Sequence, residues 1–223
     1  MVIFDKKQDL KRQLRETGKY MMQYDLAWGN SGNISAKTEE SSFLITASGT
    51  YLGDLDLEDF AECSIETGQG IGSGRKPSKE IPMHLAIYET RPEIGAVLHA
   101  SPLYSTLVAS SNIEIPSSWF VEGMYYLEKI ERVPYAHPGS KELGELVREQ
   151  AKKANILLLE NHGVLVYDTS LKEAKMALQT LEMACRMLVI SQKAGVHIQE
   201  LSEEKVQSFL VDSGYKPRRK WEH

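Results

Sequence analysis

Short apolar segments alternate with longer amphipathic segments along most of this 223-residue chain, and this alternation restricts its fold more than any other feature. Segments 94–99, 155–160 and 164–167 are apolar runs of strand length. Segments 139–153 and 171–194 instead carry apolar residues at helical spacing among charged ones. A chain that mixes these two patterns folds as an α/β protein. We therefore predict a three-layer α/β/α arrangement, with helices on both sides of a central, mainly antiparallel sheet.

The remaining segments fit the same architecture. An amphipathic helix is predicted at 5–26 and a helix at 79–90, with Ser78 as its N-cap and Pro82 in its first turn. Another helix is predicted to begin near Pro102. Short strands are predicted at 33–36, 42–46, 61–66 and 130–135. Glycines interrupt the stretch between 67 and 77, which is predicted to be irregular.

Length and charge limit the classes of protein to which the chain can belong. With 223 residues, 42% of them hydrophobic, it can enclose one good core, and we expect a single domain over 1–223. The formal net charge of −5 argues against a general nucleic-acid binder. A C-terminal tail is expected from about residue 211. Its basic run at 216–220 is either a solvated end or a segment that folds over a neighbour's anionic site.

Apolar segments and cysteines indicate the cellular compartment. No run approaches the length of a membrane span, and the first residues lack the order of a signal peptide. We expect no membrane partner and a cytoplasmic location. The two cysteines, Cys63 and Cys185, are far apart in sequence, so no disulfide framework is predicted.

Two stretches of small polar residues are candidates for binding an anion. Segments 29–35 (GNSGNIS) and 46–49 (TASG) offer flexible backbone whose N–H groups can close around an anion, although ordinary turns have the same composition. Segment 76–80 (KPSKE) places Ser78, Lys79 and Glu80 at a helix start, where a bound anion is favoured. A simple capping arrangement is the alternative for segment 76–80.

Two histidines end apolar strands. His99 ends the strand at 94–99, and His162 lies in a turn between the strands at 155–160 and 164–167. A histidine at a strand end is often a hydrogen-bonded structural residue. Two such histidines together with a carboxylate would form a minimal metal site.

Six short motifs in this order resemble those of the class II aldolase/adducin family. They are GNSGNIS, LITASG, KPSKE, AVLHAS, PYAHPGSKEL and LLLENHG, and they extend over residues 28–168. The resemblance, closest to L-fuculose-phosphate aldolases, implies an α/β/α fold with an antiparallel sheet. It also implies a divalent metal, usually zinc with manganese or cobalt as alternatives, and a homotetramer with active sites between subunits.

The resemblance also implies roles for particular residues. It assigns the metal to Glu80, His99 and His162, with Ser101 at the position of a usual third histidine. Glu80 is in addition the residue that moves the proton. For the phosphate of the substrate it implies the following residues: Asn33, Ser48, Gly49 and Ser78. Lys79 replaces a serine of the family pattern and adds a positive charge to this pocket.

Two departures from the family pattern affect the chemistry. A hydroxyl is a poor zinc ligand, so Ser101 leaves three strong ligands, and either water or another side chain, such as His137 or His84, completes the site. The tyrosine that protonates the departing carbon in the aldolases corresponds to Phe120, so Tyr104 or Tyr126 is a candidate for that role.

These features favour a metal-dependent lyase that cleaves a small phosphorylated ketose through an enediolate. Decarboxylases, dehydratases and epimerases of the same family act on related sugar phosphates, and the scaffold alone does not separate them. A non-enzymatic, adducin-like binding module is the remaining alternative. The presence of Glu80, His99 and His162 argues against it, and Ser101 argues for it.

Overall fold

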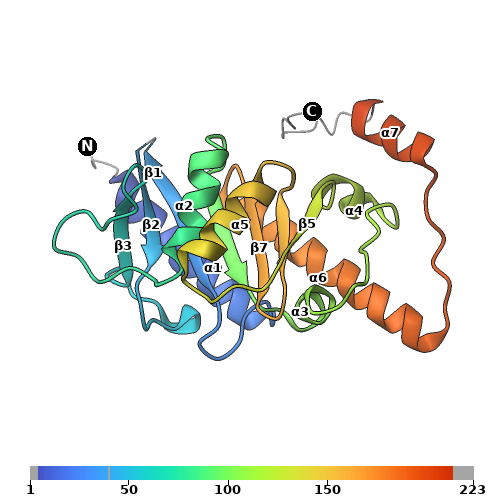
Figure 1. Ribbon diagram of the computed structural model, residues 1–223, viewed down its shortest axis with the longest axis horizontal. Helices are drawn as coiled ribbons and strands as arrows, with labels where there is room; N and C mark the ends of the chain where they lie inside the picture. The colour runs from blue at the N-terminus through green and yellow to red at the C-terminus, as the bar shows by residue number, and fades with distance from the viewer. Residues whose placement is uncertain (1–4, 40, 213–223) are drawn as a thin grey trace.

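The structure, a computed structural model, describes residues 5–39 and 41–212 (Figure 1). Its centre is one seven-stranded sheet in the order β3-β2-β1-β4-β7-β6-β5. Neighbouring strands are antiparallel except for β5 and β6, which are parallel. The strands are β1 Asn33–Glu39, β2 Ser42–Thr46, β3 Phe60–Ser64, β4 Ala96–Ala100, β5 Ile130–Val133, β6 Ile156–Leu159 and β7 Gly163–Asp168. The predicted mainly antiparallel sheet is confirmed.

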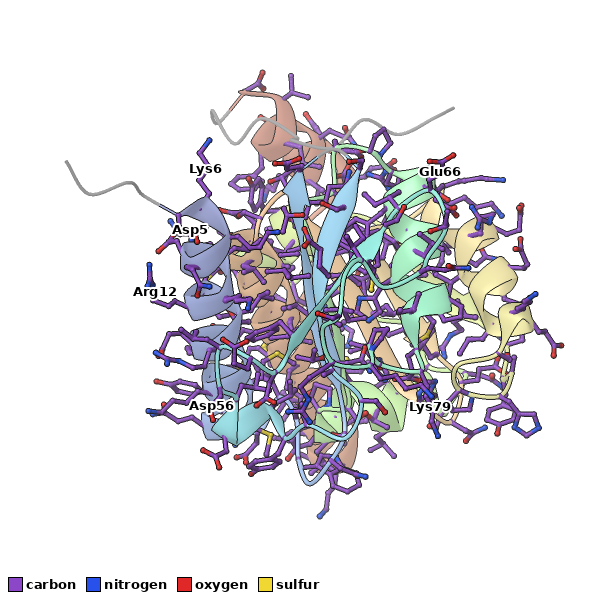
Figure 2. All side chains as sticks on the ribbon, turned by 90° about the vertical axis from the view of Figure 1, so that its left-hand side faces the viewer. Asp5, Lys6, Arg12, Asp56, Glu66 and Lys79 are labelled. Carbon is purple, nitrogen blue, oxygen red and sulfur yellow. The ribbon has the colours of Figure 1, made fainter. Side chains whose placement is uncertain are left out.

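Helices cover both faces of this sheet, as the view along its edge makes clear (Figure 2). One face packs against α1 Lys6–Gln23, α3 Leu103–Ala109, α4 Val121–Tyr126 and α6 Leu171–Ala194. The other face packs against α2 Ile81–Thr90 and α5 Lys141–Ala151. Each side has its own apolar core, so the strands between them are buried on both faces. This explains why β4, β6 and β7 are continuous apolar runs rather than alternating ones.

Local capping groups fix most helix ends. The carboxylate of Asp5 accepts hydrogen bonds from the backbone N–H groups at the start of α1, and Ser140 and Ser170 do the same for α5 and α6. Gly195 ends α6 in the left-handed conformation, with φ of 64°. The predicted helices at 5–26, 139–153 and 171–194 are therefore confirmed, the first two somewhat shorter than expected.

The start of α2 differs from the prediction. A helix that began at Lys79 with Ser78 as N-cap would place Pro82 at the position whose N–H makes the first intrahelical hydrogen bond, which proline cannot donate. The helix begins instead at Ile81, where Pro82 falls in the first turn, and Glu80 is the N-cap. The Ser78 hydroxyl accepts a hydrogen bond of 3.2 Å from the Glu80 backbone N–H. This leaves the Glu80 side chain outside the helix and directed across the end of the sheet.

Two helices have no counterpart in the predictions. The six-residue α4 is too short to give a helical pattern. Helix α7, Glu203–Asp212, has no buried residue and contacts the short helix α4 (Figure 1). The basic run at 216–220 lies outside the described residues, as does most of the tail expected from about 211.

Cys63 in β3 and Cys185 in α6 are both buried and free, and they lie in the cores on opposite sides of the sheet. Within residues 5–39 and 41–212, no helix combines the length and apolar character that crossing a membrane requires.

Candidate metal and catalytic site

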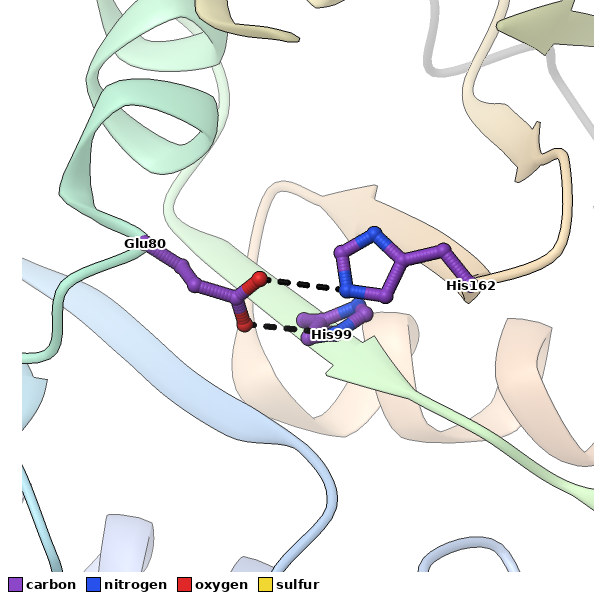
Figure 3. A group of neighbouring side chains, drawn as sticks. All are labelled: Glu80, His99 and His162. Carbon is purple, nitrogen blue, oxygen red and sulfur yellow. Dashed lines mark ion pairs between the residues drawn. The ribbon is translucent and has the colours of Figure 1, made fainter. Parts of the chain in front are cut away.

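Three segments that are distant in sequence meet at one end of the sheet. Glu80 precedes α2, His99 lies in the central strand β4, and His162 lies in the turn between β6 and β7. Figure 3 shows the Glu80 carboxylate directed at both imidazole rings. Glu80 Oε1 is 3.1 Å from His162 Nε2, and Oε2 is 3.4 Å from His99 Nε2. The structure thus brings together the three residues predicted to hold a metal, with ligand atoms within 4.8 Å of one another.

Glycine at position 163 allows the His162 turn to approach the central strand. Asn161 has a φ of 52° and Gly163 a φ of 149°, so the turn reverses within a few residues. A side chain at Gly163 would lie 2.8 Å from the Ser101 hydroxyl oxygen. The Ser101 hydroxyl itself donates a hydrogen bond of 3.3 Å to the His162 carbonyl. Ser101 therefore joins the two strands that carry the histidines.

The charge of the site follows from its surroundings. Burial raises the pKa of the Glu80 carboxyl, but a hydrogen bond from His162, charge attraction to His99 and His162, and a hydrogen bond from Asn33 together outweigh this effect and lower the pKa to about 2. Burial lowers the pKa of His99, and the nearby Glu80 only partly offsets it. An ionised Glu80 thus faces a neutral His99 at neutral pH. A negative carboxylate beside an imidazole lone pair attracts a cation.

Hydrogen bonding at His99 fits a metal ligand. Its Nδ1 donates a hydrogen bond of 3.1 Å to the carbonyl of Val164, so in the neutral ring Nε2 carries the lone pair. That lone pair faces Glu80 Oε2, and two acceptors in contact are unfavourable unless a cation lies near both. Orientation of an imidazole through its other nitrogen is typical of metal-binding histidines. The donor set of two imidazoles and one carboxylate suits a catalytic zinc ion.

Neither side chain considered as a further ligand joins this group. Both ring nitrogens of His84 are hydrogen-bonded, Nε2 to Asn33 and Nδ1 to Ser35. His137 is exposed, and its Nδ1 lies 3.4 Å from the Tyr135 hydroxyl. Within the part of the chain that the structure describes, the group therefore consists of Glu80, His99 and His162.

The residues predicted to bind phosphate lie on adjoining backbone. The turn after β2 pairs with the segment before α2, through a hydrogen bond of 2.8 Å from the Ser48 N–H to the Lys76 carbonyl and one of 3.1 Å from the Ser78 N–H to the Thr46 carbonyl. Gly49 has a φ of 79° and open space around it. Lys79 is exposed, and Figure 2 places it at the lower end of the molecule.

Asn33, the remaining residue predicted to bind phosphate, contacts the Glu80 carboxylate. Its Nδ2 donates a hydrogen bond of 2.6 Å to Glu80 Oε2, and its Oδ1 lies 2.5 Å from His84 Nε2. Sequence reasoning assigned Asn33 to the phosphate and missed this contact with the carboxylate.

The two candidates for a catalytic tyrosine are placed differently. The Tyr126 hydroxyl donates a hydrogen bond of 3.0 Å to Glu173, which ties it to α6. Tyr104 and Phe120 line a cavity of about 840 Å³ that also includes Trp28. The Trp28 indole donates a hydrogen bond of 2.9 Å to the Ser101 carbonyl, so this cavity adjoins the strand end that carries His99.

Comparison with known proteins decides the family. The family model described as the Class II Aldolase and Adducin N-terminal domain matches residues 12–189. The chain belongs to the class II aldolase and adducin family. The resemblance identified in the sequence motifs is therefore confirmed, together with the fold class.

Family relatives include two kinds of lyase. The chain is 31% identical to the 3-oxo-tetronate 4-phosphate decarboxylase of Escherichia coli over 82% of this chain and 87% of that protein. It is 34% identical to the L-fuculose phosphate aldolase of Methanocaldococcus jannaschii over 84% of this chain and 97% of that protein. Among solved structures, YgbL of Escherichia coli matches with a TM-score of 0.81, 28% identity and coverage of 91% and 98%. An L-fuculose 1-phosphate aldolase matches with a TM-score of 0.79, 28% identity and coverage of 89% and 93%.

Proposed function

We propose that this protein is a metal-dependent lyase that breaks a carbon–carbon bond next to the carbonyl group of a small phosphorylated sugar. The observation that carries the proposal is the ionised Glu80 held between His99 and His162 at the end of the sheet. These three side chains would hold the metal. When bound, the metal would act as a Lewis acid that stabilises negative charge on the substrate's carbonyl oxygen.

Glu80 is proposed to move the proton. It is the one carboxylate in the group, and its Oε2 already accepts a hydrogen bond from Asn33. The carboxylate therefore has a fixed orientation toward the space between the histidines. A general base must lie within hydrogen-bonding distance of the proton that it takes. Among the described residues, Glu80 has the position that this role requires.

A phosphate group is proposed to bind where the turn after β2 meets the start of α2. Ser48 and Gly49 contribute to the turn, and Ser78 lies on the paired segment. Within residues 5–39 and 41–212, the Lys79 ammonium makes no ion pair or hydrogen bond, so its charge is available to an anion. Charge-assisted hydrogen bonds are about twice as strong as neutral ones. Loss of the charge in Lys79→Ala should therefore raise KM for a phosphorylated substrate.

Two reactions fit the site, and the first is aldol cleavage of a ketose phosphate. A base removes the proton of the hydroxyl group beyond the bond that breaks. The electrons of that bond then pass to the carbonyl, giving an aldehyde and an enediolate. The enediolate carbon must finally be protonated. The resemblance to fuculose-phosphate aldolases, at 34% identity in one relative, supports this reaction.

The second reaction is decarboxylation of a 3-oxo sugar-acid phosphate. Here carbon dioxide leaves, the bond electrons pass to the carbonyl, and a proton then adds to the carbon. No hydroxyl proton has to be removed, and no aldehyde has to be accommodated. The decarboxylase relatives support this alternative, and so does Phe120, which offers no acid at the aldolase tyrosine position.

The metal, the assembly and the compartment complete the proposal. Zinc fits two imidazoles and a carboxylate, with manganese or cobalt as alternatives. A homotetramer is proposed from the family resemblance, and the exposed Trp28 and Leu103 beside the cavity are compatible with a neighbouring subunit there. The cytoplasm is the proposed location.

The test combines metal analysis with a product screen on protein purified without chelator. Ketose 1-phosphates and 3-oxo-tetronate 4-phosphate would be supplied with zinc, manganese or cobalt. Aldehyde release identifies the aldolase, and carbon dioxide release identifies the decarboxylase. A protein that binds no divalent metal at millimolar supply and converts neither class would overturn the proposal and favour the binding module.

A further inference from the structure

A chain of five hydrogen-bonded side chains runs from the site into the core. It begins at the Glu80 carboxylate and passes through Asn33 and His84 to Ser35 and Tyr88. The distances along it are 2.6, 2.5, 2.7 and 2.8 Å. The inner three residues are buried, with His84 and Ser35 at 0% exposure and Tyr88 at 2%. No solvent reaches them that could replace a missing hydrogen bond.

The number of available protons fixes which atom donates in each of these hydrogen bonds. An ionised carboxylate only accepts hydrogen bonds, so the Asn33 atom that faces Glu80 must belong to the NH₂ group. The Asn33 oxygen then faces His84 and can only accept, so the proton of the neutral His84 ring must be on Nε2. His84 Nδ1 consequently accepts a hydrogen bond from Ser35.

The inner end of the chain is consistent with this direction. The single hydroxyl proton of Ser35 is used toward His84, so the Tyr88 hydroxyl must donate to Ser35. Burial lowers the pKa of His84 to about 3, with His99 adding to the effect and Glu80 opposing it. Burial raises the pKa of Tyr88, so its hydroxyl keeps the proton that it donates. With a neutral His84, the four hydrogen bonds of this path form together only in that one arrangement.

We propose that His84 is a positioning residue, whose Nε2–H fixes the Asn33 amide so that its NH₂ group holds the Glu80 carboxylate in place. The proposal deepens the proposed function, on which it rests for the role of Glu80. His84 binds no metal and touches no substrate in this scheme. The opposite tautomer would place a lone pair against the Asn33 oxygen and allow the amide to rotate.

This arrangement gives Asn33 a second use. Its NH₂ group has two hydrogens, and the structure describes one acceptor for them, Glu80 Oε2. Because His84 holds the Asn33 oxygen, the plane of the Asn33 amide is fixed. The direction of the second N–H of Asn33 is therefore fixed as well. The positioning of Glu80 and the orientation of a donor beside it are therefore set by one buried imidazole.

The first experiment reads the tautomer directly and needs no substrate. Long-range ¹H–¹⁵N spectra of ¹⁵N-histidine-labelled protein separate Nε2–H from Nδ1–H imidazole, and His84→Gln identifies the resonance. We expect neutral, Nε2-protonated His84 with and without zinc. An Nδ1–H tautomer, or a protonated ring at pH 7, would overturn the proposal even in an active enzyme.

The second experiment removes the donor and then restores it. His84→Leu deletes both ring nitrogens, whereas the amide of His84→Gln can supply an N–H near the Nε2 position. Supporting groups behind metal ligands typically contribute 10–100-fold to metal affinity or activity. We expect His84→Leu to weaken zinc binding by about tenfold or more, measured by chelator competition, and to lower kcat by about tenfold or more. His84→Gln should recover most of the loss.

A matched pair of tyrosine variants separates positioning from general loss of a buried hydroxyl. Tyr88→Phe removes the inner end of the chain, and Tyr167→Phe removes a hydroxyl that donates to the Ala154 carbonyl in the same core. Only Tyr88→Phe should lower kcat.

If His84→Leu folds and keeps wild-type zinc affinity, or if His84→Gln performs no better than His84→Leu, then His84 has no positioning role. A wild type without lyase activity would count against the proposed function, while the tautomer and zinc affinity would still decide the role of His84.

Discussion

Glu80 and Glu182 are both partly buried carboxylates that contact distant segments, but their partners differ in kind. Glu182 in α6 accepts hydrogen bonds of 3.0 and 2.8 Å from the backbone N–H groups of Tyr104 and Ser105, and one of 2.6 Å from the Ser105 hydroxyl. Glu80 faces one amide and two imidazoles. The partners of Glu182 cannot leave without unfolding α3, whereas imidazoles can bind a cation instead.

The two helix starts explain this difference. Helix α3 begins after Pro102 and has no capping side chain of its own, so Glu182 supplies an acceptor to its free N–H groups. Helix α2 has Glu80 at its N-cap, but the carboxylate makes no capping hydrogen bond. The Glu182 carboxylate thus accepts from backbone N–H groups and stabilises the fold, whereas the Glu80 carboxylate faces side chains and remains able to bind a cation.

Glu80→Gln should give the largest effect and separates the two carboxylates most sharply. The amide cannot accept a proton in the same way and binds cations weakly, so kcat should fall by about 10³-fold, within the range of general acid–base catalysis. The free energy of unfolding should fall as well, because the lowered pKa of Glu80 means that its ionised carboxylate stabilises the folded state. Steady-state kinetics and denaturant unfolding on the same samples measure both quantities, and unchanged kcat would remove Glu80 from the mechanism.

Glu182→Gln should lower stability without the loss of kcat expected for Glu80→Gln. Three hydrogen bonds at the start of α3 are made to the Glu182 carboxylate. The substitution replaces this charged acceptor with a neutral amide. We expect a loss of about 2 kcal/mol in the free energy of unfolding and near-normal kcat in the folded protein. Urea unfolding checks this, and a stable variant with greatly reduced kcat would contradict the assignment of Glu182 to the fold.

Acid should destabilise the metal-free protein through His84. The folded state lowers the pKa of His84 from 6.5 to about 3, so its contribution is fully present above pH 6.5 and is lost as the pH falls through 3. This predicts a loss of about 2 kcal/mol between pH 7 and pH 5 from this residue. Glu80 contributes in the same direction at lower pH, below 4.5. His84→Gln should have a flatter dependence between pH 7 and pH 5, and an equal slope would contradict the buried neutral imidazole.

Ser101→His is expected to give the smallest effect and tests whether the site lacks a ligand. Ser101 follows His99 by two residues at the end of β4, so an imidazole there would point to the same side. Zinc affinity should rise by about tenfold. The gain is limited because the Ser101 hydroxyl also bridges to the His162 turn. Chelator competition measures the affinity, and Ser101→Ala is the control for loss of that bridge.

Sequence patterns predicted the elements whose residues are buried together. The apolar runs of β4, β6 and β7 and the long α6 stood out because both faces or one continuous stripe are buried. Helices α4 and α7 were missed because one is very short and the other has no buried face. The parallel pairing of β5 with β6 was not predictable, because strand direction depends on the path of the whole chain.

The sequence predicted three side chains that the fold brings together at the site, but it did not predict the side chains that support them. Glu80, His99 and His162 belong to recognisable motifs, and the fold brings them together. The hydrogen bond from Asn33 to Glu80 depends on packing between β1 and the start of α2, which no local pattern records. His84 was considered as a ligand for the same reason, since its residue type gives no sign that Ser35 and Asn33 occupy both ring nitrogens.

The central position of β4 has a consequence for the order of folding. This strand pairs with residues of β1 that lie 60–66 positions earlier and with residues of β7 that lie 64–72 positions later. His99 therefore reaches its neighbours only after long loops have closed on both sides, and such non-local pairing makes folding slow. High-affinity zinc capture during refolding should consequently lag behind helix formation, so that a bound ion marks the moment at which the middle of the sheet is complete.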